Sequence, residues 1–257
     1  MARPVAQPRS RRERRSQQRA ERSRSVVKQA PSWRSPVALT TVGAVLVGLV
    51  VIVLAGGLSF GGGSKAVITP ETSYEALATN ASTVGSAFAP VTMTIYSDFQ
   101  CPICKRFLTT ELPSLLRQFV APGTLRIESR DIDVVDRAGG SESLNLAIGG
   151  ACAAEQNAYW PYHDLVFWNQ GRENSGYHDS AFIDRMAGAA GLDLAAFDTC
   201  RAGSSVRQAV LRATSAAAGD GIAATPTIEV NGQRFVGLPD YDQLSALIRE
   251  LASPSAS

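Results

Sequence analysis

The sequence is poor in the residue types on which zinc sites and disulfide-scaffolded miniproteins depend. Its 257 residues include only four cysteines and two histidines. Four cysteines are too few to hold together a small secreted scaffold. No internal repeat is visible, and 45% hydrophobic with 19% charged residues excludes a wholly disordered or fibrous chain. Length and composition together indicate one or two ordinary folded domains.

Charge is missing altogether between Arg34 and Lys65. Within this gap, residues 37–58 are apolar apart from two threonines and small glycines. A helix of that length spans about 33 Å, enough to cross a hydrocarbon core of about 30 Å. The run is too long, and its flanks too polar, for a buried helix of a soluble domain. The sequence therefore predicts a transmembrane segment at residues 35–60.

The remaining charge is divided unevenly on either side of this segment. Residues 1–34 carry a net charge of +9, and residues 65–257 a net charge of −7. The positive-inside rule places the basic arm in the cytoplasm and the rest outside it, in a single-pass cell-membrane protein. The apolar run exceeds the usual signal-peptide core, which favours an uncleaved signal anchor. We expect a disordered arm that sets topology and contacts anionic lipid of the bilayer, with no nucleic acid bound.

Beyond the membrane segment, the composition predicts a linker and then a folded α/β domain. Residues 61–89 are rich in Gly, Ser, Thr and Ala, which predicts a linker that is flexible or loosely docked, with one short helix near 73–79. Residues 91–96 alternate in polarity, as a strand does. A helix over 105–120, kinked at Pro113, and a second strand over 125–130 complete a parallel β-α-β unit.

The second half of the domain (90–252) is predicted to be a helical insertion followed by a hairpin and a helix. The insertion covers about residues 136–220, with helices at 143–157, 159–169, 181–190, a short one capped by Asp193, and 204–218. Two strands flank Asn231-Gly232, the preferred pair for a type I′ turn. A last helix covers 241–251. The predicted order is β-α-β, helical insertion, β-β-α.

Cys101 and Cys104 form a Cys-x-x-Cys motif where the first strand meets its helix. A thiol at a helix N-terminus faces unpaired amides and the positive end of the helix dipole, which lower its pKa. Pro102 suits the first helical turn because the missing N–H costs nothing there. We expect Cys101 to be the exposed, attacking sulfur and Cys104 the buried, resolving one. The motif also occurs in zinc and copper sites, so a metal site stays an alternative from spacing alone.

The residues around this motif resemble a known family. Asp98-Phe99-Gln100-Cys101-Pro102-Ile103-Cys104 after a strand, and Ala224-Thr225-Pro226-Thr227 before a hairpin, look like the DsbA-type thiol–disulfide oxidoreductases of the thioredoxin superfamily. The resemblance covers about residues 85–251. It implies a thioredoxin-like fold and a cis Pro226 packed opposite the cysteine pair. It also implies that Thr225 offers its backbone to a substrate strand.

Two positions depart from the family pattern. Thioredoxin-like relatives often carry a buried acid where this chain has Ile95, and strongly oxidising relatives carry His where it has Ile103. Asp98 lies closer to the pair and is a candidate for proton transfer or, equally, for a cap of the loop. A missing histidine donor predicts a potential below the oxidising extreme of the family.

All four cysteines lie beyond the membrane segment, which fits an oxidising compartment. We predict a structural disulfide between Cys152 and Cys200, worth about 4 kcal/mol on the chain-entropy model. Two free thiols, or a second redox-active pair, are the alternatives. Five aromatic residues between 159 and 168 are predicted to be mostly core, with a peptide-binding groove as the alternative. His163 and His178 are interpreted as structural or surface residues.

These features predict a membrane-anchored extracytoplasmic thiol oxidase that uses Cys101 and Cys104, with no cofactor and no metal. Exported thiol-bearing proteins would be its substrates. The resemblance implies re-oxidation by a quinone-linked membrane partner of the DsbB or vitamin-K-epoxide-reductase kind. A reductase or isomerase of the same fold is one alternative, and a copper-binding or chaperone-like protein is another. No heptad or dimer module is visible, which favours a monomer.

Overall fold

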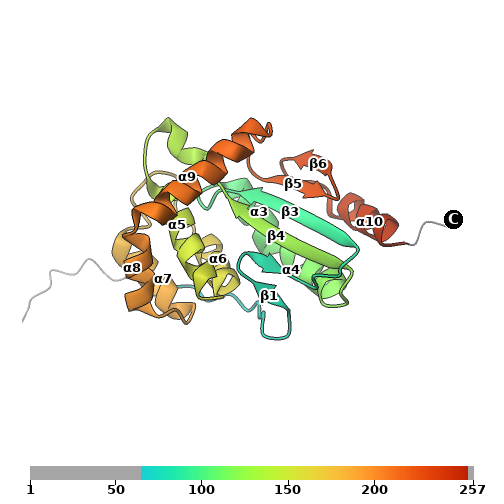
Figure 1. Ribbon diagram of the computed structural model, residues 1–257, viewed down its shortest axis with the longest axis horizontal. Coiled ribbons are helices and arrows are strands. Elements are labelled where there is room, and N and C mark those ends of the chain that lie inside the picture. The colour runs from blue at the N-terminus through green and yellow to red at the C-terminus, as the bar shows by residue number, and fades with distance from the viewer. Residues whose placement is uncertain (1–64, 254–257) are drawn as a thin grey trace, which may run out of the picture. The chain divides into compact units, whose positions relative to one another are not determined.

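The computed structural model describes residues 65–253, which form one α/β unit (Figure 1). The predicted basic arm (1–34) and membrane segment (35–60) lie outside the described residues, as do the first linker positions 61–64. Between residues 65 and 253, no helix combines the length and apolar character needed to cross a membrane. The description below therefore concerns the predicted thioredoxin-like domain and the part of the linker next to it.

A mixed sheet of six strands forms the centre of this unit, in the order β1-β2-β4-β3-β5-β6. The strands are β1 (Thr79–Asn80), β2 (Thr83–Val84), β3 (Val91–Ser97), β4 (Leu125–Asp131), β5 (Thr227–Val230) and β6 (Gln233–Val236). β3 and β4 run parallel, with Ser97 opposite Asp131, and β5 runs antiparallel to β3. The predicted β-α-β unit is confirmed. Its two strands end side by side, which brings Ser97 and Asp131 close to the cysteine motif.

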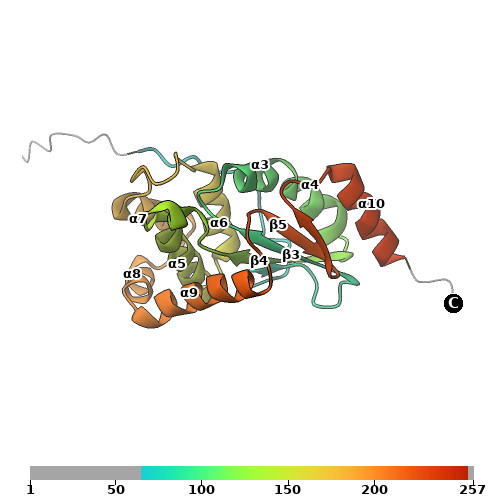
Figure 2. The same cartoon turned by 90° about the horizontal axis from the view of Figure 1, so that it is seen from above.

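The polarity pattern of β3 explains why it is the central strand. Val91, Met93 and Ile95 are completely buried on one face, while Thr92 and Thr94 are half-buried on the other. Tyr96 is buried on that second face because helix α9 covers this end of the strand, as Figure 2 shows. The alternation predicted from sequence is therefore present, and both faces are covered where the strand approaches the cysteines.

The helices divide into a group that packs on the sheet and a group that forms the insertion. They are α3 (Pro102–Thr110), α4 (Leu112–Leu115), a π-helix (Leu116–Val120), a 3-10 turn (Val135–Ala138), α5 (Glu142–Glu155), α6 (Tyr159–Trp168), α7 (Ser180–Ala189), α8 (Leu194–Arg201), α9 (Ser204–Gly219) and α10 (Tyr241–Ala252). Figure 2 shows α3 and α4 on one side of the sheet and α9 on the other. The predicted insertion helices and the last helix are all present.

The helix predicted over 105–120 differs in detail from the structure. It begins at Pro102, three residues earlier than predicted, and it is interrupted at Glu111. Pro113 has no amide to donate to the carbonyl four residues before it, so the hydrogen-bond ladder breaks just ahead of the proline. The helix then resumes and ends in π-helical geometry. The predicted kink is present, two residues before the predicted position.

The stretch 65–89 was predicted as linker, and the structure corrects this. The Tyr74 hydroxyl donates to Asp164 over 3.0 Å, and Asn169 bonds the backbone of Ile68. No helix forms near residues 73–79. The stretch leads instead into the short β1–β2 hairpin, which forms because β2 pairs with the edge of β4 and buries Val84 completely.

Local signals in the second half of the domain are confirmed residue by residue. Asp193 caps α8 by accepting hydrogen bonds from the amides of Ala195 and Ala196. Asn231 and Gly232 have φ angles of 45° and 90°, as the predicted turn between β5 and β6 requires. These elements depend on neighbours in sequence, which is why sequence alone predicts them.

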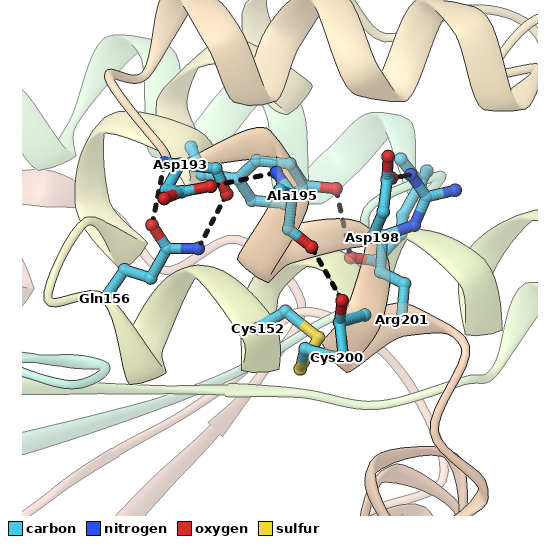
Figure 3. Close-up of a disulfide and its surroundings, with 10 residues drawn as sticks. Cys152, Gln156, Asp193, Ala195, Asp198, Cys200 and Arg201 are labelled. Carbon is cyan, nitrogen blue, oxygen red and sulfur yellow. Dashed lines mark hydrogen bonds and ion pairs between the residues drawn. A yellow bond between two sulfur atoms is a disulfide. The ribbon is translucent and has the colours of Figure 1, made fainter.

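The predicted pairing of Cys152 with Cys200 is present in the structure. The disulfide joins α5 to α8 across a sequence separation of 48, with 5.8 Å between the Cα atoms. Beside it, the Gln156 side chain exchanges two hydrogen bonds with the backbone of Asp193 (Figure 3). Helices α5 and α8 of the insertion are therefore linked by the disulfide and, beside it, by the two hydrogen bonds between Gln156 and Asp193.

Candidate active site

The two remaining cysteines are free thiols at the first turn of α3. Cys101 is the N-cap residue, and its Sγ accepts a hydrogen bond from the Cys104 amide over 3.3 Å. Pro102 occupies the first helical position, as predicted. Cys104 is completely buried, whereas Cys101 keeps 6% of its surface exposed. Cys101 is thus the more accessible sulfur, but it is far less exposed than the sequence suggested.

Several hydrogen bonds converge on the Cys101 sulfur and lower its pKa to about 6. The largest contribution is the hydrogen bond with the Cys104 thiol. Burial opposes it, and bonds with Thr225 and with the amides of Cys104 and Ile103 add to the lowering. Those amides are the unpaired donors of the helix N-terminus. At neutral pH the group is therefore mainly a thiolate, which is the nucleophilic form of cysteine.

The neighbouring thiol is shifted in the opposite direction. Burial raises the pKa of Cys104 well above its ordinary value, and the hydrogen bond and charge of Cys101 raise it further. The pair thus shares one proton. Cys104 carries it and donates it in a hydrogen bond to the Cys101 thiolate. This division fits one attacking sulfur and one sulfur that stays protonated until it is needed.

Thr225, distant in sequence, lies beside the same sulfur and precedes Pro226. The Thr225–Pro226 peptide bond is cis, as the family resemblance implied. The Thr225 carbonyl oxygen lies 3.3 Å from Cys101 Sγ, across a separation of 124 residues. The structure therefore brings the predicted catalytic pair and the predicted substrate-binding pair together.

Asp98 has the contacts of a loop cap. It is completely buried, and its carboxylate accepts hydrogen bonds from the amides of Gln100, Val134 and Val135 at 2.8 Å each. The Ser143 hydroxyl also donates to it, over 2.6 Å. Four donors use up the acceptor capacity of the carboxylate. Of the two alternatives for Asp98, the structure favours the cap over proton transfer.

Gln170 is a site residue that sequence reasoning missed. Its side-chain amide donates to the carbonyls of Phe99 and Cys101, at 2.7 and 3.0 Å. It follows α6, so it ties the insertion to the loop that carries the cysteines. The contact joins positions 71 and 69 residues apart, and no local pattern in the sequence marks it.

The aromatic run of α6 is mainly core, as predicted. Tyr159, Trp160, Tyr162 and Phe167 are each at most 2% exposed, and only Trp168 reaches the surface, at 38%. The alternative of a peptide-binding groove along this run is therefore not supported for the four buried rings.

Both histidines are buried among protein contacts. His163 bonds Asp164 over 3.0 Å, and His178 bonds Glu142 over 2.7 Å. Burial lowers the pKa of His178. In the part of the chain that the structure describes, no group of three His, Cys, Asp or Glu residues is arranged to hold a metal ion. The histidines therefore contribute to packing in this unit.

The origin of the Cys101 shift can be tested by changing its donor. In Cys104→Ala, the main hydrogen bond to the thiolate is lost, so the pKa of Cys101 should rise from about 6 toward its ordinary 9.0. Cys104→Ser keeps a hydroxyl donor and should preserve most of the lowering. The rate of alkylation by iodoacetamide, followed against pH, measures both values. An unchanged midpoint in Cys104→Ala would mean that the helix amides alone set the pKa.

Comparison with known proteins agrees with this geometry. The thioredoxin family model matches residues 78–250. Disulfide bond formation protein D of Bacillus subtilis is 24% identical over 176 residues, covering 65% of this chain and 75% of that protein. Among solved structures, oxidised BdbD from Bacillus subtilis has a TM-score of 0.61 at 19% identity, covering 73% of this chain and 99% of that one. Reduced DsbA from Mycobacterium tuberculosis has a TM-score of 0.57 at 22% identity, covering 69% and 94%.

A Cys-x-x-Cys pair at a helix N-terminus, opposite a cis-proline on a mixed sheet, defines a thiol–disulfide oxidoreductase with a thioredoxin-like fold. The chain belongs to the thioredoxin family, and the relative and solved structures named above are disulfide bond formation protein D, BdbD and DsbA. It is therefore a DsbA-like disulfide oxidoreductase.

Proposed function

We propose that this protein is a membrane-anchored, extracytoplasmic thiol oxidase that introduces disulfides into exported proteins through Cys101 and Cys104. The observation that carries the proposal is the Cys101 pKa of about 6. This value lies between those of thioredoxin, about 7, and of DsbA, about 3.5. A stabilised thiolate favours the reduced dithiol over the disulfide, so the oxidised enzyme becomes a stronger oxidant.

The reaction proceeds by two exchange steps. A substrate thiolate attacks Cys101 Sγ in the Cys101–Cys104 disulfide, a mixed disulfide forms, and Cys104 leaves and takes up a proton. A second substrate thiolate then attacks the substrate sulfur of the mixed disulfide and releases Cys101 as a thiolate. The substrate loses two electrons and gains a disulfide, and the enzyme ends as the dithiol. The high pKa of Cys104 supports this direction, because a protonated Cys104 does not attack the mixed disulfide.

Substrate contact is assigned to the loop before β5. Thr225 presents its backbone beside Cys101 and is joined to Pro226 by a cis peptide bond. Ile103 and Val236 are exposed large apolar residues, at 48% and 71%, on α3 and at the end of β6. β6 pairs Val236 with Thr227, directly after the proline. Exposed apolar residues on the helix that follows Cys101, and on the strand paired beside Pro226, support binding of unfolded, thiol-bearing polypeptides.

The location and partner are proposed from the sequence. The uncharged run 35–64 with its basic N-terminal flank supports a membrane anchor with residues 65–257 outside the cytoplasm. A Cys152–Cys200 disulfide is consistent with an oxidising compartment. The family resemblance supports a quinone-linked membrane re-oxidase, which would regenerate the Cys101–Cys104 disulfide after each turnover.

The reduction potential of Cys101–Cys104 tests the proposed direction. The purified full chain is equilibrated with glutathione buffers, and the fraction of dithiol is read by alkylation. We expect a value between about −120 and −180 mV, the range of DsbA and protein disulfide isomerase. A value near thioredoxin's, about −270 mV, would replace the oxidase with a reductase. Absence of a reversible couple, together with a retained metal, would support the copper-binding alternative instead.

A further inference from the structure

A cavity of about 480 Å³ lies between α5, α9 and the edge of β4, apart from the cysteine motif. Its walls are small residues of the two helices, namely Ala147, Gly150, Ala151, Ala209, Ala213 and Ala217. Its polar lining residues are Ser82, Ser129, Arg130, Asp131, Tyr159 and Asp220. The volume falls in the range of small-molecule sites, about 300–1,000 Å³, and nothing in the proposed exchange reaction uses it.

The cavity exists because β2 covers only part of the β4 edge. β2 pairs with β4 at Ile127 and Glu128, and the Ser129 amide still donates to the Ser82 carbonyl. Within residues 65–253, no strand continues along the edge beyond that point. Along a strand, successive backbone N–H groups point to opposite edges. The Asp131 amide therefore points to the same edge of β4 as the Ser129 amide, which is the edge that β2 covers only in part. The uncovered end of β4 therefore faces the cavity.

Two polar groups of the lining are incompletely paired within residues 65–253. Ser129 is 3% exposed, and its hydroxyl makes no hydrogen bond with any described residue. The Asp131 carboxylate accepts from Tyr159 at 2.8 Å and from Ser97 at 3.3 Å, yet no Lys or Arg within residues 65–253 pairs with it. A half-buried carboxylate without a cation and a buried hydroxyl without a partner both cost free energy.

Arg130 also lines the cavity, but its guanidinium bonds groups other than Asp131. The guanidinium of Arg130 bonds Glu128 at 3.0 Å and the Tyr96 hydroxyl at 3.1 Å. The side chains of Glu128 and Tyr96 lie on one face of the sheet. Asp131 lies on the opposite face, together with Ser97. Asp220 lines the same cavity and adds a second acid. The lining therefore holds two acids and one guanidinium, which is already bonded to Glu128 and Tyr96, among apolar walls.

We propose that this cavity is a binding site for a small apolar ammonium compound, whose charged nitrogen donates to the Asp131 carboxylate. The apolar body would lie along the alanine faces of α5 and α9. An anion is disfavoured by the two acids. A neutral alcohol fills the same space but leaves the carboxylate without a cation.

Phenethylammonium and its neutral analogue phenethyl alcohol are the probes that test the proposal. Binding of each to the purified full chain is followed by thermal shift and by titration calorimetry. The ammonium should bind at least about tenfold more tightly than the alcohol, because a charge-assisted hydrogen bond is worth more than a neutral one. Equal affinities for the two probes would overturn the proposal.

Three variants locate the binding. Asp131→Asn should remove the preference for the ammonium while alcohol binding persists. Ala151→Leu should fill the cavity and abolish both, and Ala218→Leu, an exposed position on α9 outside the lining, should change neither. Alkylation of Cys101 near pH 6 verifies that each variant is folded. Ammonium binding that survives Ala151→Leu, or a preference that survives Asp131→Asn in a folded protein, would contradict the assignment.

Discussion

Replacing Cys101 with serine will abolish thiol–disulfide exchange, with a loss of at least roughly a thousandfold in rate. The substitution removes the sulfur whose pKa is lowered to about 6 and leaves Cys104, which is completely buried and protonated. Neither a serine hydroxyl nor a buried thiol can replace the thiolate at neutral pH. The measurement is the rate at which the purified protein oxidises a reduced dithiol peptide.

Cys104→Ser is the informative partner of this variant. It keeps Cys101 and should still form a mixed disulfide with a single-thiol disulfide reagent, which then persists because neither a second substrate thiol nor Cys104 is present to break it. Cys101→Ser should form none. Trapping with a disulfide reagent and mass spectrometry separates the two. Substantial exchange by Cys101→Ser, or trapping through Cys104 in that variant, would show that the assignment of the two roles is wrong.

The parts of the fold that sequence predicts are those governed by neighbouring residues. The alternation in β3, the Asn231-Gly232 turn and the Asp193 cap each depend on a few adjacent positions. Their physics is the two-residue period of a strand, the positive φ of a tight turn and the orphan amides of a helix end. Such elements can be assigned without knowing the rest of the molecule.

The parts that sequence mispredicts depend on contacts between distant residues. Residues 65–89 look like a linker because they are rich in small and polar residues. They are ordered by partners far along the chain: Tyr74 bonds Asp164 across 90 positions, and Ile68 bonds Asn169 across 101. The β1–β2 hairpin likewise forms on the edge of β4. Amino-acid composition does not reveal these distant partners.

The same division applies to the candidate site. Cys101, Cys104 and Pro226 follow from motifs with a known context, and the structure brings them together. The hydrogen bond from Gln170 to the Cys101 carbonyl cannot be predicted from the sequence. The sequence also does not show that Cys104 donates the hydrogen bond to Cys101, because this direction depends on how deeply each sulfur is buried. Sequence therefore identifies the reacting groups, and the structure is needed to explain their reactivity.

Removing the second disulfide should lower the free energy of unfolding by about 4 kcal/mol without abolishing exchange. The bond links α5 to α8 across 48 positions, and in the chain-entropy model it stabilises by restricting the unfolded chain. In Cys152→Ala/Cys200→Ala, the hydrogen bonds between Gln156 and Asp193 remain, so the insertion should keep its structure. A loss of this size is a large fraction of the 5–15 kcal/mol typical of a folded domain.

Urea denaturation of the full chain measures this loss and also its mechanism. If the bond acts on the unfolded state, the double variant should show a lower midpoint and a somewhat steeper dependence on urea, because an unlinked chain exposes more surface. Wild-type protein in dithiothreitol should follow the same curve. The rate of peptide oxidation below the transition should match that of the wild type. A loss of less than about 1 kcal/mol, combined with slower exchange, would instead make Cys152–Cys200 a second redox-active pair that passes electrons from Cys101 and Cys104.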